Sequence, residues 1–94
     1  MEVAGRIICN EVEVVSLDGW KDYVFDTNYD LPKLRDVENY IAEHGHLKEI
    51  PSEAEVLENG YNLGEMDALL LKKIEELTLY VIDLKKEINE LKSK

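Results

Sequence analysis

Residues 70–91 read LLKKIEELTLYVIDLKKEINEL. With Ile74 at heptad position a, every a and d position from Leu70 to Leu91 holds Leu, Ile or Val. A hydrophobic repeat of 3.5 residues over three heptads is typical of helices that wind around each other. The stretch therefore predicts a coiled-coil helix over residues 63–94 that joins copies of the chain. The seven residues of this seam are Leu70, Ile74, Leu77, Val81, Leu84, Ile88 and Leu91.

An ordinary amphipathic helix that packs on its own domain is the alternative interpretation. After residue 82, most positions outside the seam hold Glu, Lys or Asn, which leaves a narrow apolar stripe. A helix in the core of a small domain has a wider apolar stripe. The pattern therefore favours association between copies.

Residues beside the seam bear on orientation and copy number. In a parallel coiled coil, position g faces position e of the next heptad of the neighbour, so Glu87 would face Lys92. β-branched a residues with Leu at d favour two strands. Leu71 and Tyr80 flank the seam and widen it, which favours three. From the heptads alone, homodimer and homotrimer both stay open.

The length and charge of the chain fit this interpretation. Its 94 residues carry 21 acidic and 11 basic side chains, a net charge of −10. A chain this short has a marginal core and usually needs a disulfide, a metal or oligomerisation. Cys9 is the single cysteine, so an internal disulfide is excluded, and we expect Cys9 to be a small core residue. The acidic charge disfavours nucleic acid and anionic membranes as partners.

Upstream of the long helix, the sequence predicts two further parts. Residues 6–15 are rich in β-branched residues and partly alternate, which predicts β structure within a segment 1–19. Residues 20–62 read as a small head with two short helices. The expected fold is therefore mostly α, with a short N-terminal β segment. In this fold a small α+β head lies on a long C-terminal helix that forms a parallel coiled coil.

Local signals place the helix ends. Leu31-Pro32 should begin the first helix, after Asp30, and Gly45 should end it. The Ser52 and Glu55 pair forms a capping box for the second helix, in which Val56 and Leu57 should face inward and which Gly60 should end. Asn62 is the expected N-cap of the final helix.

The aromatic stretch Trp20–Phe25 should fill much of the core of the head, because large rings in a small domain need burial. An exposed aromatic patch is the alternative. In that interpretation Trp20, Tyr23 and Tyr29 would contact a binding partner.

No residue pattern in the sequence predicts catalysis or a cofactor. His44 and His46 have no third ligand at metal-site spacing, so we expect them to cap carbonyls or pack. Ser16 with Lys21 is a weak pattern for a self-cleaving dyad. We therefore expect no enzyme, no metal and no cofactor. Acidic residues at a spacing of four lack the calcium-loop pattern, and read as solvated surface: Asp18, Asp22, Asp26 and Asp30.

The segments Asn62–Met66 and Leu70–Tyr80 resemble the C-terminal domain of tail-fibre-like proteins of Bacteroidetes bacteria and their phages. Further segments fall in the same order upstream: Trp20–Phe25, Leu34–Ile41, His46-Leu47, Ile50–Ser52, Glu55-Val56 and Asn59-Gly60. Lys48-Glu49 departs from the turn that the family usually has after His-Leu. The layout is similar to phage tail-spike caps, in which a terminal coil brings three chains into register.

The resemblance implies a homotrimer that acts as a structural registration domain at the end of a tail fibre or surface stalk. It also implies a virion or extracellular location, although the chain starts without a signal-peptide pattern and contains no membrane-spanning stretch. Two further functions stay open. One is a multivalent module that binds a host-surface glycan or protein, and the other is a self-processing intramolecular chaperone.

Overall fold

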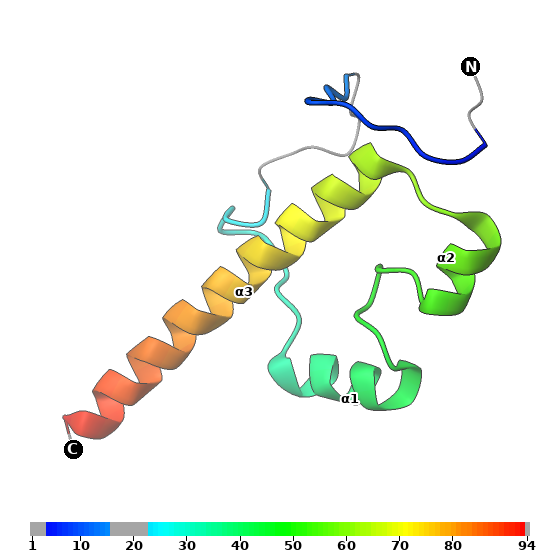
Figure 1. Cartoon of the computed structure of the whole chain (residues 1–94). Coiled ribbons are helices and arrows are strands. Elements are labelled where there is room, and N and C mark those ends of the chain that lie inside the picture. The colour runs from blue at the N-terminus through cyan, green and yellow to red at the C-terminus, as the bar shows by residue number, and fades with distance from the viewer. Residues whose placement is uncertain (1–3, 16–22, 94) are drawn as a thin grey trace.

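The computed structural model describes residues 4–15 and 23–93, and these ranges contain three helices (Figure 1). They are α1 (Leu34–His44), α2 (Glu53–Asn59) and α3 (Leu63–Lys92). α3 is a single straight rod that runs to the C-terminal end, while α1 and α2 lie to one side of it (Figure 1). The chain measures 62 × 30 × 25 Å along its principal axes.

The predicted β segment and α+β head are wrong for the described residues. Residues 4–15 and 23–93 contain no strand, so this part of the chain is all-helical. β-branched residues favour a strand only where a neighbouring strand completes the hydrogen-bonded ladder. Residues 6–15 have no such neighbour among the described residues, and Ile8 is 85% exposed. The part of the predicted segment in 1–3 and 16–19 lies outside the described residues.

The predicted caps of α2 and α3 are confirmed. The Glu55 backbone N–H donates to Ser52 Oγ at 3.2 Å, and the Ser52 N–H donates to Glu55 Oε1 at 3.2 Å. At the start of α3, the Glu65 N–H donates to Asn62 Oδ1 at 3.1 Å. These bonds satisfy backbone N–H groups that have no partner within a helix. Gly60 follows the last residue of α2, as predicted.

The predicted start of α1, with Pro32 as the first helical residue, is two residues too early. α1 begins at Leu34, and its N-cap Lys33 provides no side-chain cap. Lys33 is extended, with φ −70° and ψ 141°, so Pro32 and Lys33 both lie before the helix. The carbonyl of Pro32 instead accepts a hydrogen bond from the Tyr80 hydroxyl of α3. The predicted end is confirmed, because Gly45 takes the left-handed conformation and its N–H donates to Ile41 O at 2.8 Å.

The core of the described chain is very small. Val24 is the one hydrophobic side chain that is buried among the described residues, with 1% of its surface exposed. Phe25 is exposed, as is Cys9, so the predictions that they belong to a core are wrong. Leu57 of α2 was also expected to face inward and is exposed. These side chains stay exposed because the described residues form no sheet against which they could pack.

The dimensions agree with a chain that buries little of itself. Its radius of gyration is 17.7 Å, whereas a compact chain of this length has a value of about 12 Å. Its accessible surface is 8528 Å², against about 5,600 Å² for a compact monomer of this size. Burial of apolar surface is what offsets the conformational entropy lost on folding. The chain therefore leaves much of its apolar surface in water.

Candidate functional site

The seam side of α3 is exposed along its whole length. The seven predicted seam residues are all exposed, from 45% for Leu84 to 70% for Leu91. In the first eighteen residues of α3, the half-buried and buried residues lie at the other heptad positions. They are Gly64, Met66, Ala68, Leu69, Leu71, Lys72, Lys73, Glu75, Glu76, Leu79 and Tyr80.

This distribution separates two faces of one helix. Leu70, Ile74 and Leu77 stay exposed at the level where the upstream residues contact α3. Those contacts reach heptad positions c, f and g, as Glu76, Lys72 and Lys73 illustrate. Positions f and c lie opposite the a/d seam on a helix, because each residue advances by about 100°. The upstream residues therefore contact α3 at positions outside the seam, and the seam stays exposed.

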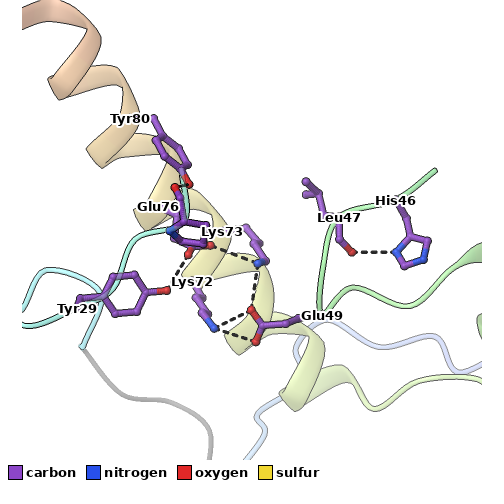
Figure 2. Close-up of polar contacts among 9 residues, drawn as sticks. Tyr29, His46, Leu47, Glu49, Lys72, Lys73, Glu76 and Tyr80 are labelled. Carbon is purple, nitrogen blue, oxygen red and sulfur yellow. Dashed lines mark hydrogen bonds and ion pairs between the residues drawn. The ribbon is translucent and has the colours of Figure 1, made fainter. Parts of the chain in front are cut away.

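A polar cluster of five residues makes this attachment (Figure 2). Glu76 is 6% exposed and accepts a hydrogen bond from the Tyr29 hydroxyl at 2.7 Å. Lys73 Nζ lies 3.3 Å from Glu76 Oε1 and 3.2 Å from Glu49 Oε1. Lys72 Nζ donates to both oxygens of Glu49 at 2.8 Å. A buried carboxylate is tolerated when hydrogen bonds and an opposite charge replace its water, and Glu76 has both.

Glu49 adopts a backbone conformation that is unusual for its residue type. Its φ is 74°, and it is the one non-glycine residue with positive φ in the described ranges. The left-handed region costs roughly 1–2 kcal/mol for a residue with a Cβ. The bonds to Lys72 and Lys73 hold the side chain in place and compensate for this cost. The same bonds attach the loop that follows α1 to the side of α3.

The cluster shifts the pKa values of Tyr29, Glu49 and Lys72 in directions that keep the contacts formed. The Lys72 hydrogen bond, with help from Lys73, lowers the pKa of Glu49 despite partial burial. For Lys72, burial lowers the pKa but the bond to Glu49 outweighs it, so the net shift is upward. Burial and the bond to Glu76 raise the pKa of Tyr29. At neutral pH Tyr29 is therefore a neutral donor, and Glu49 and Lys72 form a charged pair.

A cleft of about 580 Å³ separates α1 from α3. Tyr80, whose hydroxyl donates to the carbonyl of Pro32, lines it beside Leu77. The cleft thus borders the seam. Its apolar lining on the upstream side consists of Leu31, Pro32, Leu34, Val37, Tyr40, Ile41 and Leu47.

The two histidines pack on an aromatic ring. The rings of His44 and His46 have their centroids 4.1 and 5.8 Å from that of Tyr40. This agrees with the packing interpretation of the pair. Within residues 4–15 and 23–93, no group of three or more His, Cys, Asp or Glu side chains is placed to hold a metal ion.

The predicted aromatic patch is partly engaged inside the chain. Tyr23 and Tyr29 pack together with ring centroids 5.7 Å apart, and the Lys72 ammonium lies 5.7 Å from the Tyr23 ring centroid. With its hydroxyl bonded to Glu76, Tyr29 belongs to the attachment between the upstream residues and α3. The remaining predicted residue of the patch, Trp20, lies outside the described residues. The same holds for Ser16, Asp18, Lys21 and Asp22.

The sequence interpretation missed the polar cluster. Apart from the Lys73 and Glu76 pair, its contacts join residues 23 to 47 positions apart, and no local spacing relates them. One signal was available, namely two charged pairs, Lys72-Lys73 and Glu75-Glu76, in the most apolar half of α3. Charged residues in an apolar environment are rarely buried unless they are paired.

Comparisons with known proteins provide no further guide. No protein-family model, curated protein or solved structure matches the chain. The resemblance to tail-fibre-like domains therefore stays a prediction. Among the described residues, no helix is both long and apolar enough to cross a membrane.

Proposed function

We propose that this chain is a homo-oligomerisation domain whose α3 helices associate in parallel through the seam from Leu70 to Leu91. The observation that carries the proposal is the exposed seam on a helix whose opposite side is already held by its own chain. This arrangement disfavours the alternative of an ordinary amphipathic helix. Such a helix would turn its apolar stripe towards its own domain.

The exposed apolar area suits a stable interface. From their exposed fractions, the seven seam side chains leave roughly 700 Å² in water, close to the ~800 Å² that each partner buries in a typical stable complex. The occupant that matches this surface best is another copy of α3. A sustained a/d repeat packs knobs into holes against a helix with the same period.

Parallel orientation and three copies are part of the proposal. Glu87 at position g and Lys92 at the following e position would form an attractive pair between parallel neighbours. Leu71 and Tyr80 widen the apolar region beside the seam, which favours a homotrimer over a homodimer. A role at the end of a fibre or surface stalk, where the domain would hold chains in register, rests on the resemblance alone.

Sedimentation equilibrium at micromolar concentration tests the proposal. We expect the mass of three chains for the unmodified protein. The double variant Leu77→Asp, Leu84→Asp should sediment as a monomer, because it places two carboxylates per chain in the seam. The matched control Lys86→Asp, Asn89→Asp adds two carboxylates at positions f and b and should keep the oligomer. A monomeric unmodified protein would overturn the proposal.

A second function as a receptor-binding module has less support. Tyr29, one of the three residues predicted for that patch, uses its hydroxyl for a bond within the chain. The Tyr23 ring contacts both the Tyr29 ring and the Lys72 ammonium. These contacts favour a structural role for both tyrosines.

A further inference from the structure

The cleft between α1 and α3 lies on one particular flank of the seam. Its wall on α3 consists of Lys73, Glu76, Leu77 and Tyr80, at heptad positions g, c, d and g. In a parallel coiled coil, the g flank of one helix faces the e flank of its neighbour. A neighbouring α3 that packs along the seam would therefore pass beside this cleft, between α3 and α1.

The α1 side of the cleft is suited to an apolar contact. Leu34 and Ile41 lie on one face of α1, and both line the cleft while remaining exposed. Leu47 in the following loop completes the apolar lining and is also exposed. Three exposed aliphatic side chains beside the exposed Leu77 extend the hydrophobic surface of the seam sideways onto α1.

The edge of α3 that would face this cleft carries matching residues. Ile82 at position b is exposed, although a coiled-coil seam does not require an apolar residue there. The Thr78 hydroxyl at position e donates to Ile74 O at 2.9 Å, which leaves its methyl group for an apolar contact. Lys85, the next e residue, would lie opposite Tyr80, where Asp30 and Asp36 line the cleft. Lys33, Lys48 and Lys73 also line the cleft, so the complementarity rests on the apolar side chains.

We infer that α1 of each copy packs on the e/b edge of the next copy's α3, with Ile82 of that copy placed in the cleft. This inference rests on the proposed oligomerisation and extends it. The domain would be an interlocked assembly in which every α3 is held between the α3 and the α1 of a neighbour. The small core of the isolated chain would then be completed by the next copy.

The contact would also set the register of the assembly. The seam itself repeats Leu, Ile and Val, so a shift by one heptad changes few of its contacts. Position b is different, because it holds Glu75, Ile82 and Asn89 in successive heptads. A shift by one heptad in either direction would place Glu75 or Asn89 against the aliphatic side chains of α1 that line the cleft. Burying a polar side chain without a partner is costly, so the in-register assembly is favoured.

Cross-linking between differently tagged chains tests this inference. All chains carry Cys9→Ser, because Cys9 is exposed and would react. One chain carries Ile41→Cys and the other Ile82→Cys, and the two are refolded together and treated with a short bismaleimide. We expect a covalent product with the summed mass of both chains. Pairing Ile41→Cys with Asn89→Cys, one heptad further along the same edge, should give much less product.

A third variant separates failure of the inference from failure of the proposed function. Leu84→Cys lies at position d, where parallel in-register helices bring identical residues together, so it should cross-link to itself. If Leu84→Cys cross-links but the Ile41 and Ile82 pair does not, the oligomer exists and the inference is wrong. Equal yields for the Ile82 and Asn89 pairs would also overturn it. If Leu84→Cys fails to cross-link, parallel association itself is wrong.

Discussion

The two halves of α3 are supported in different ways. Residues 63–80 have contacts from upstream segments, including the bonds of Glu76 with Tyr29 and of Lys72 with Glu49. Every residue from 81 to 92 is exposed. Helices of about twelve residues are marginal in water when nothing packs on them. The first half of α3 is thus held by its own chain, and we expect the second half to depend on the proposed association between copies.

The largest expected effect is loss of the second half of the helix when association is abolished. In the monomeric variant Leu77→Asp, Leu84→Asp, amide hydrogens of residues 81–92 should exchange freely, while some protection should remain in residues 63–80. Hydrogen exchange with residue-level resolution measures this. The Lys86→Asp, Asn89→Asp protein is the control and should keep protection in both halves. Equal loss in both halves of the seam variant would contradict the comparison.

A graded test of the same comparison changes one seam residue at a time. Leu84→Ala and Leu70→Ala each remove a large side chain from the proposed interface, at a cost of roughly 2–5 kcal/mol per buried leucine. Leu84→Ala should lower the midpoint of thermal unfolding more, because its surroundings have no other support. Circular dichroism melts at several protein concentrations measure both midpoints. A larger effect at Leu70 would show that the first half carries the assembly.

The attachment of the first half can be weakened without touching the seam. Tyr29→Phe removes the donor to the Glu76 carboxylate, which should cost about 1–3 kcal/mol because a buried acceptor loses a partner. Exchange should speed up in residues 63–80, while the sedimented mass should stay unchanged. Tyr61→Phe is the matched control, since Tyr61 is exposed. Dissociation of the Tyr29→Phe protein would mean that the cluster and the seam are not independent.

The smallest expected effect is a pH dependence from Glu49. Its pKa in the folded chain is lowered by Lys72 and Lys73 from an ordinary value of 4.5. Its stabilising contribution is therefore present above pH 4.5 and is lost as the pH falls through the lower folded value. Because Glu49 is partly exposed, solvent screening keeps the effect below about 1 kcal/mol. Unfolding midpoints of the unmodified protein and Glu49→Gln should differ at pH 7 and approach each other as the pH falls below 4.5.

The parts of the fold that local sequence determines were predictable. Asn62, Gly45 and the Ser52 and Glu55 pair act on neighbouring backbone groups, so their effect can be read within a few residues. The heptad repeat predicts α3 for the same reason. Whether its seam joins copies stays a prediction.

The parts that depend on distant residues were not predictable. A strand over residues 6–15 needs a partner strand, which local β propensity does not supply. The link between Tyr29 and Glu76 spans 47 positions, and no spacing rule relates them. The start of α1 was missed because the carbonyl of Pro32 bonds to Tyr80, which is 48 residues away. Contacts of this range are set by how the elements meet, which one sequence does not show.

The left-handed backbone at Glu49 has a consequence for sequence variation. Glycine would adopt φ 74° without steric cost, which would return roughly 1 kcal/mol. The same change would remove the ion pairs to Lys72 and Lys73, whose worth at a partly exposed site is similar. The two effects nearly cancel, so Glu49→Gly should barely change the midpoint of thermal unfolding. It would nevertheless release the loop that carries Leu47 from α3. The shape of the cleft would then change while the overall stability stayed the same.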